Sequence, residues 1–216
     1  AVTLTQDFYA GVFEVTQMQW LKVTGANPSS FGKLSEPVEN LSYDLIRGSA
    51  EQGGGGWPAN DAVYESSFMG LLRAKTGIAR FDLPTEAQWE YLCRAGTTSY
   101  YNDGLEGSSD EQLSELGWWV GNSEGTTHTV GLKTPNAWSL FDTHGNVWEL
   151  CLDWYGAVLA GGGDPQGANS GVFRIAKGGG WGSPAPHCRP AFRNYSGLTS
   201  DYYDSSIGCR LVVNLP

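Results

Sequence analysis

Three histidines are the residues of this chain best suited to bind a metal or move a proton, and their spacing predicts neither. His128, His144 and His187 include no pair four residues apart of the kind that binds a metal from one face of a helix. The sequence also lacks a Gly-x-Ser-x-Gly elbow for a nucleophilic serine. The spacing of these residues therefore predicts no catalytic role, and we expect His144 to be structural.

The cysteines do not form a metal-binding pattern either. Four of them occur, without the close pairs typical of zinc sites, at Cys93, Cys151, Cys188 and Cys209. In a chain of 216 residues they could form at most two disulfides, which is not a disulfide-dense protein. The sequence leaves their pairing and the redox compartment open.

The glycine run at residues 53–56 is the remaining feature that resembles a catalytic or cofactor motif. It precedes Trp57 and Pro58, and no Lys-Ser or Lys-Thr pair follows to contact a phosphate. The run therefore predicts a flexible loop.

Charge and composition exclude two broad classes of partner. The net charge is −10, and neither nucleic acid nor an anionic membrane surface favours such an acidic chain. No apolar stretch approaches the length needed to span a bilayer. Nine Trp, ten Tyr and eight Phe occur beside thirty Gly, which indicates a loop-rich protein held together by aromatic side chains. The first residues lack a Met and a basic stretch, which is typical of a trimmed start.

Three helix starts can be predicted from capping patterns. Thr16 precedes Gln19 by three residues, and Thr85 precedes Gln88 in the same way, so both pairs predict capping boxes. Gly25 is a fitting end for the first of these helices. A further helix is expected between a cap at residues 60–61 and an end at Gly77.

Strands are expected at residues 8–15, 173–175 and 207–213, where apolar residues alternate or run together. Residues 95–136 contain only short pieces punctuated by glycine, which we expect to be ordered by packing or by a bound ion. No linker is evident. The pattern predicts one α+β domain over residues 1–216, with few helices, short strands and much irregular structure.

Six short phrases together resemble the formylglycine-generating-enzyme (sulfatase-modifying factor) family. They occur in the family's order over nearly the whole chain, at residues 14–17 (EVTQ), 37–42 (PVENLS), 83–91 (LPTEAQWEY), 145–149 (GNVWE), 177–181 (KGGGW) and 207–210 (IGCR). The resemblance implies a C-type-lectin-type fold. The family contains oxidases, sulfoxide synthases and non-catalytic members, so the fold does not give the function.

The resemblance to the oxidases fails at the pair of cysteines that binds copper. In those enzymes two thiols five residues apart follow the Gly-Gly phrase, and two soft sulfurs suit Cu(I). Here Cys188 is present, but Ser183 occupies the other position. We expect Cys188 to be a packed residue or half of a structural bridge and the protein to be no enzyme, with no catalytic cofactor. The oxidase reading is kept as an alternative.

Two other activities found in this family or fold lack their motifs. The sulfoxide synthases bind iron through several histidines in a pattern that this chain lacks. Calcium-dependent lectins of this fold use Glu-Pro-Asn or Gln-Pro-Asp together with Trp-Asn-Asp, and none of these tripeptides occurs. Calcium-dependent sugar binding is the second alternative.

A structural calcium ion is implied by the resemblance at residues 141–149. In the oxidases an ion lies at the corresponding turn, and hard oxygen ligands in a loop suit Ca²⁺. By position, the ligands would be the side chains of Asp142 and Glu149 and the carbonyls of Gly145 and Val147. The alternative is that both carboxylates simply hydrogen-bond within the loop.

The residues after Trp181 have an unusual composition. Lys, Glu, Gln, Met and Trp make up 35 of the 216 residues, so the last 35 positions should contain about six of them, and they contain none. No codon that ends in a pyrimidine encodes any of these five residues. In this respect the chain resembles the variable proteins of diversity-generating retroelements, in which adenine mutagenesis of codons ending in a pyrimidine varies the residues between the Gly-Gly-x-Trp and Ile-Gly-x-Arg phrases.

The resemblance places the variation in residues 182–206, the tail segment. Within it, residues 188, 189, 191 and 193 look like fixed framework. The positions expected to vary, and to bind a ligand, are Gly182, Ser183, Pro184, Pro186, His187, Phe192, Asn194, Tyr195, Ser196, Tyr202, Tyr203, Asp204, Ser205 and Ser206. Tyr and Phe supply rigid contact area and Ser, Gly, Asn and Asp adaptable hydrogen bonds, as in antibody paratopes. An ordinary polar surface loop is the alternative interpretation.

The expected partner is a macromolecule, either a protein or another cell-surface molecule, with Phe192, Tyr195, Tyr202 and Tyr203 as anchors. We expect the arginines at 189, 193 and 210 to pair with carboxylates or carbonyls rather than with a ligand. The resemblance implies an extracellular or cell-surface location, with a lipid anchor before trimming.

Overall fold

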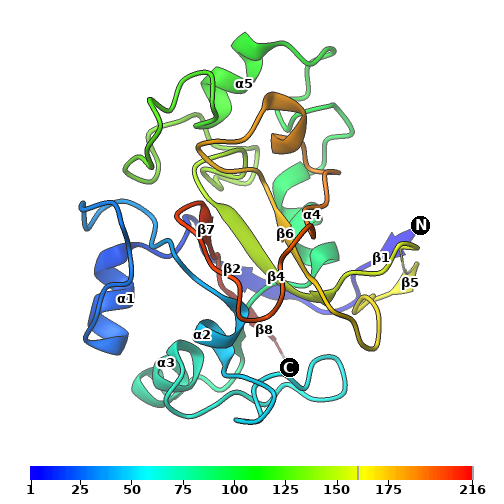
Figure 1. Ribbon diagram of the computed structural model, residues 1–216. Coiled ribbons are helices and arrows are strands. Elements are labelled where there is room, and N and C mark those ends of the chain that lie inside the picture. The colour runs from blue at the N-terminus through cyan, green and yellow to red at the C-terminus, as the bar shows by residue number, and fades with distance from the viewer. Residues whose placement is uncertain (160, 216) are drawn as a thin grey trace.

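Short elements joined by long irregular segments make up this protein (Figure 1). The structure is a computed structural model that describes residues 1–159 and 161–215. Its α-helices are α1 (Gln17–Thr24), α2 (Tyr43–Arg47), α3 (Phe68–Thr76), α4 (Glu86–Arg94) and α5 (Asp110–Leu116). The predicted α+β class, with few helices and short strands, is confirmed. Among the described residues, no helix has both the length and the apolar character needed to cross a bilayer.

Three small sheets contain the strands of the described part of the chain. One places β4 (Trp148–Trp154) between β6 (Arg174–Lys177), which is antiparallel to it, and β7 (Ile207–Gly208), which is parallel. Another places β8 (Val212–Asn214) between β2 (Phe8–Ala10) and β3 (Phe81–Asp82), antiparallel to both. The parallel pair of β1 (Val2–Thr3) and β5 (Gly162–Gly163) completes the set. The two ends of the described chain therefore meet in one sheet, through β2 and β8.

Two of the three predicted helix starts are confirmed in detail. Thr16 caps α1 and Thr85 caps α4, each in a complete capping box with the glutamine three residues on. The third prediction was wrong at its start and right at its end, since α3 begins after Ser67 and ends at Gly77. The side chain of Asn60 instead accepts a hydrogen bond from the Ala62 N–H, which closes a local turn.

The strand predictions were partly wrong. Only residues 8–10 of the expected strand 8–15 are extended into a sheet. The expected strand 207–213 is divided between β7 and β8, because the chain changes sheets around Arg210. Strand β4 was not predicted, and it is the centre of its sheet.

Buried ion pairs and stacked arginines hold the elements together. Arg210 pairs with Glu149 at 2.7 Å, and Arg47 pairs with Asp82 at 2.9 Å, all four side chains being almost inaccessible. The guanidinium of Arg174 lies 3.6 Å from the ring centre of Tyr43 and 3.3 Å from that of Trp154. Since breaking a buried pair leaves an uncompensated charge, these contacts favour a single rigid arrangement of the sheets.

Candidate functional site

The tail segment lies across the sheet that contains β4. It begins after Trp181, passes through a 3₁₀ helix at Ala185–Cys188, and returns to the sheet as β7 (orange to red in Figure 1). Trp148 of β4 has ring contacts with two side chains of the segment, with centroids 5.8 Å from Phe192 and 6.4 Å from His187. The segment is thus spread over the surface of the fold and anchored at both ends by sheet strands.

Thirteen of the fourteen residues expected to vary have side chains or backbone accessible to solvent. Seven are exposed, namely Gly182, Pro184, Pro186, Tyr195, Ser196, Tyr202 and Tyr203. Six are half-buried, namely His187, Phe192, Asn194, Asp204, Ser205 and Ser206. The structure therefore brings nearly all of the predicted positions to the surface, and the most exposed aromatic residue among these positions is Tyr203, at 64%.

Ser183 is the exception, because it is buried and bonded to the framework. Its hydroxyl accepts a hydrogen bond from the Gly180 N–H at 2.9 Å, and its carbonyl accepts one from the Val120 N–H at 3.1 Å. The side chain is 6% exposed. In this structure Ser183 shapes the turn that follows Trp181.

Main-chain hydrogen bonds hold the tail segment in place. Asn194 and Ala176 exchange two such bonds, at 2.9 and 3.0 Å. The carbonyl of Asp204 accepts from the Asn40 N–H, and that of Ser206 accepts from the Trp148 N–H. Because nearly every residue type can make these bonds, the course of the backbone depends little on which side chains the segment carries.

Aromatic rings of the tail segment form two separate groups. The rings of His187 and Phe192 stack 4.1 Å apart. Tyr195 stacks on Tyr155 with centroids 3.5 Å apart. The side chains of Phe192 and Tyr195 therefore already have a supporting ring beneath them, whereas Tyr203 makes no ring contact among the described residues.

Of the four residues expected to be framework, Cys188 and Arg193 contact the fold closely, whereas Ala191 is exposed and Arg189 Nε has no hydrogen-bond partner among the described residues. Cys188 is fully buried, and a Cβ added at Gly179 would lie 2.5 Å from its sulfur, so only glycine fits against it. Arg193 forms a two-pronged ion pair with Glu86 of α4. Arg210 pairs with Glu149, as predicted for an arginine that serves the fold.

The geometry around Cys188 does not favour copper chemistry. Burial raises the pKa of its thiol to about 12, so the sulfur stays protonated at neutral pH. Ser183 at the other position offers a hydroxyl that is already hydrogen-bonded. Nucleophilic chemistry needs the thiolate, which burial disfavours here, and only one thiol is present where a copper pair needs two. All four cysteines are buried and free.

His144 is also committed to the fold. Its Nδ1 lies 2.7 Å from the Cys188 carbonyl oxygen, and its Nε2 accepts from the Asn102 N–H at 3.3 Å. Burial lowers its pKa to about 4, so the ring is neutral near pH 7. These contacts agree with the structural role expected for this residue.

The partners of the predicted calcium ligands show how far those residues fit the ion. The carboxylate of Glu149 accepts three hydrogen bonds from Arg210. Asp142 accepts a backbone N–H through Oδ2, whereas its buried Oδ1 has no partner. Ca²⁺ takes roughly six to eight oxygen ligands, and within the described part of the chain no three His, Cys, Asp or Glu side chains form a metal-binding group. As it lies, the Glu149 carboxylate is occupied by Arg210, whereas Asp142 keeps one oxygen without a partner among the described residues. Calcium ligation stays a prediction for Asp142, Gly145, Val147 and Glu149.

Besides Glu149 and Asp142, a third buried carboxyl group lies near the ion pair of Arg210 and Glu149. Glu14 accepts hydrogen bonds from the Asn146 amide and the Val147 N–H. Burial, followed by the charges of Asp142 and Glu149, raises the pKa of Glu14 well above its ordinary value. Burial also raises the pKa of Asp142, to about 6. One guanidinium, that of Arg210, therefore faces three buried carboxyl groups.

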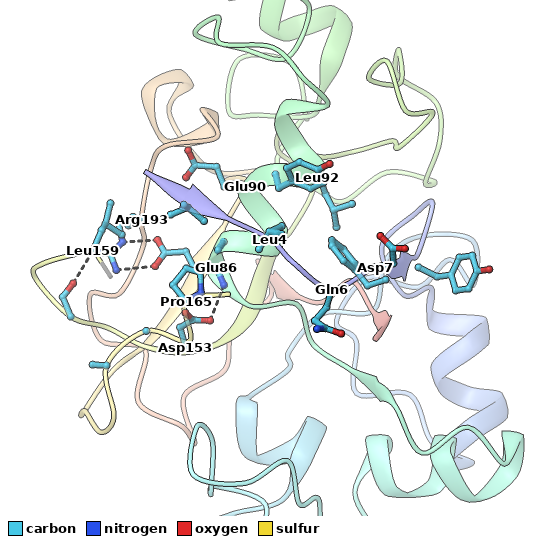
Figure 2. A pocket seen from close by; sticks show the side chains of 18 of the residues that line it. Leu4, Gln6, Asp7, Glu86, Glu90, Leu92, Asp153, Leu159, Pro165 and Arg193 are labelled. Atoms are coloured by element: carbon cyan, nitrogen blue, oxygen red, sulfur yellow. Dashed lines mark hydrogen bonds and ion pairs between the residues drawn. The ribbon is translucent and has the colours of Figure 1, made fainter. Parts of the chain in front are cut away.

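Sequence reasoning missed a cleft beside α4, here called the α4 cleft (Figure 2). Its lining comes from residues between Val2 and Leu215, so no local motif could have revealed it. Asp153 borders the cleft and accepts the Glu86 N–H at 2.7 Å. The sequence signal for the cleft was Asp153, one of two acidic residues in the otherwise apolar strand β4.

The chain matches one family model and several known proteins over most of its length. A family model described as the sulfatase-modifying factor enzyme 1-like domain matches residues 1–215. Chaperone protein LppX of Paenibacillus barcinonensis is 30% identical over 210 residues, covering 83% of this chain and 71% of LppX. The formylglycine-generating enzyme of Mus musculus is 32% identical over 214 residues, covering 88% of this chain and 50% of the enzyme. The chain thus spans about half the length of that enzyme.

Two solved structures share the fold over nearly the whole chain. Treponema denticola variable protein 1 superposes with a TM-score of 0.81 at 25% identity, covering 98% of this chain and 86% of the other. PvdO from Pseudomonas aeruginosa superposes with a TM-score of 0.74 at 23% identity, covering 99% and 83%, and this likeness concerns the fold alone. The structural comparison therefore includes a variable protein, while the sequence comparison includes enzymes.

Proposed function

The chain belongs to the family of sulfatase-modifying factor enzyme 1-like domains, and we propose that it is a non-catalytic binding protein of that family. Its tail segment is the ligand-binding surface, and the residues on that surface are diversified as in the variable proteins of retroelements. The likeness to Treponema denticola variable protein 1 supports this proposal. Ser183 in place of a second thiol supports the absence of oxidase chemistry.

The proposal rests on one observation: in the tail segment, main-chain hydrogen bonds hold the backbone in place while most side chains are accessible to solvent. Thirteen of the fourteen positions are accessible, while the backbone is held by main-chain bonds such as those between Asn194 and Ala176. A protein can tolerate random side chains only where its core does not depend on them, because surface substitutions change stability little. The seven exposed positions meet that condition, whereas Phe192 packs against the hydrophobic core and the Asp204 carboxylate accepts hydrogen bonds from Ser206.

The chemistry of the surface suits a macromolecular ligand. Tyr195, Tyr202 and Tyr203 are 37%, 42% and 64% exposed, so they can bury a large area on binding. Rigid aromatic anchors of this kind dominate protein interfaces. We infer a protein or another cell-surface molecule as partner, and an extracellular or cell-surface location, with lipid anchoring of the whole protein.

The DNA beside the gene tests the retroelement assignment. We expect a near-duplicate of the sequence that encodes the tail segment, differing from it at adenines, next to a reverse transcriptase gene. A complete neighbouring sequence that contains neither element would remove this part of the proposal.

A display experiment tests the binding surface itself. A library that varies the thirteen accessible positions with codons ending in a pyrimidine is selected against folded proteins unrelated to one another. A control library varies as many exposed positions outside the tail segment. We expect distinct binders for different targets from the first library. Equal yields from the two libraries would contradict the proposal.

A further inference from the structure

The α4 cleft has the size and shape of a small-molecule site. Its volume is about 850 Å³, within the range of known ligand pockets. The cleft lies between the N-terminal segment, helix α4 and the loop that follows β4. In Figure 2 the N-terminal chain passes in front of α4 at Leu4. None of the positions expected to vary lines it, since Arg193, its one residue from the tail segment, belongs to the framework.

The walls of the cleft are apolar and its rim is aromatic. Leu4, Phe8 and Leu92 line the interior. At the rim the rings of Tyr91 and Trp138 lie 4.8 Å apart and remain 51% and 42% exposed. Exposed apolar groups gathered around a concavity are typical of binding sites. An occupant with an apolar or aromatic body would remove these side chains from water.

The charged side of the cleft carries more carboxylates than cations. Four acidic residues and one basic residue line it. That basic residue, Arg193, is fully engaged, because it pairs with both oxygens of Glu86 and donates to the Gly156 carbonyl. Glu90 pairs with Arg94 at 2.9 Å and with the buried Lys177 at 3.2 Å.

Asp153 and Asp7 are the lining carboxylates that make no ion pair with another described residue, and of the two only Asp153 is buried. It is 2% exposed, borders the cleft, and accepts the Glu86 N–H as its hydrogen bond from α4. Burial, with the charge of Glu86 contributing further, raises its pKa to about 7. Asp7, the other lining carboxylate, is exposed at the opposite side of the cleft (Figure 2).

We propose that the α4 cleft binds an organic cation, meaning an apolar or aromatic body that carries one amine or guanidinium group. The cationic group lies against Asp153 and the neighbouring carboxylates of α4, where it forms charge-assisted hydrogen bonds. The body lies against Leu4, Leu92 and the pair of Tyr91 and Trp138, whose ring faces also attract a cation. This site does not depend on the proposed function of the tail segment.

Matched probes of one shape test the charge requirement. The binding of 4-phenylbutylamine, 4-phenylbutanol and 4-phenylbutyrate is measured by calorimetry, with the contact surface mapped by chemical shifts of the protein. We expect the amine to bind at the cleft at least tenfold more tightly than the alcohol, because only the amine forms a charge-assisted hydrogen bond with the carboxylates. Tenfold corresponds to about 1.4 kcal/mol. The acid should not bind. Equal binding of the amine and the acid, or no amine binding at millimolar concentration, would overturn the proposal.

Variants then locate the site on the protein. We expect Asp153→Asn to weaken amine binding about tenfold, a loss typical of a charged hydrogen bond, and Trp138→Ala to weaken both the amine and the alcohol. Glu65→Gln, an exposed carboxylate outside the cleft, should leave binding unchanged. Because Asp153→Asn could disturb α4, Glu90→Gln at the half-exposed rim provides a second charge removal. Unchanged amine affinity in both folded charge variants would refute the assignment.

A peptide comparison separates the two sources of such a cation. The capped tripeptide Phe-Lys-Phe and its norleucine analogue are measured against 4-phenylbutylamine. Tighter binding of the lysine peptide than of the free amine would assign the cleft to a protein segment. The reverse order would assign it to a small amine, and a norleucine peptide as tight as the lysine peptide would contradict the proposal.

Discussion

The ion pair between Arg210 and Glu149 provides the sharpest prediction about the rigid part of the molecule. Both side chains are 1% exposed, and the guanidinium also donates to the carbonyls of Gly11, Val12 and Phe141. Replacement by methionine keeps the apolar volume and removes the charge. It leaves Glu149 buried without its partner, which costs about 3–5 kcal/mol. We therefore expect Arg210→Met to lower the free energy of unfolding by about 4 kcal/mol.

Urea unfolding at pH 7, followed by tryptophan fluorescence, measures this loss. The double variant Arg210→Met/Glu149→Gln should recover at least about 1 kcal/mol, since the carboxylate that paired directly with Arg210 is removed and only Glu14 and Asp142 still face the lost charge. The matched control Arg80→Met removes an exposed arginine and should change stability by less than about 0.5 kcal/mol. The deficit of the single variant should shrink on lowering the pH from 8 to 5, because protonation relieves the buried carboxyl groups. A loss below about 1 kcal/mol would refute the reasoning.

Three further predictions concern the thiols, calcium and a histidine. Native protein should resist alkylation at pH 8 by mass spectrometry and show no copper-dependent oxygen uptake, since burial raises the pKa of Cys188 to about 12; robust turnover would support the oxidase alternative. If Asp142 binds calcium, a chelator lowers the melting temperature and Asp142→Asn removes that response, whereas an unchanged melt in chelator contradicts the ion. Because the pKa of His144 is about 4 when folded and near its ordinary value when unfolded, it makes stability fall as the pH drops between these values. His144→Gln should therefore lose less stability than wild type over that range, and equal losses would exclude this linkage.

Local capping chemistry could be predicted from the sequence, and long-range pairing could not. The capping boxes at Thr16 and Thr85 depend on residues three apart, so the sequence contains the whole interaction. The start of α3 was misplaced because Asn60 can cap either a helix or a turn, and here it closes a turn. Strand β4 is buried on nearly every residue, so it has no alternating pattern to reveal it.

Composition alone was enough to single out the tail segment as a candidate site, and its role in binding stays a prediction. The absence of five residue types after Trp181 pointed to the tail segment, and nearly all of its expected positions are accessible. The burial of Ser183 could not be foreseen, because it follows from a turn closed by Gly180 and Val120. The α4 cleft was missed because its walls come from both ends of the chain.

Thermal melting of proteins with exchanged tail side chains tests the central claim most directly. Several variants, each with the thirteen accessible positions replaced at once, are compared with Ile207→Ala in the neighbouring strand, where the side chain is 1% exposed. Truncation of Ile207 should cost about 2–5 kcal/mol. At roughly 2–4 °C per kcal/mol for a chain of this size, that is a large drop. We predict that most exchanged tails lower the melting temperature by less than half as much as Ile207→Ala does. Losses as large as that of Ile207→Ala in most of them would show that the fold depends on those side chains.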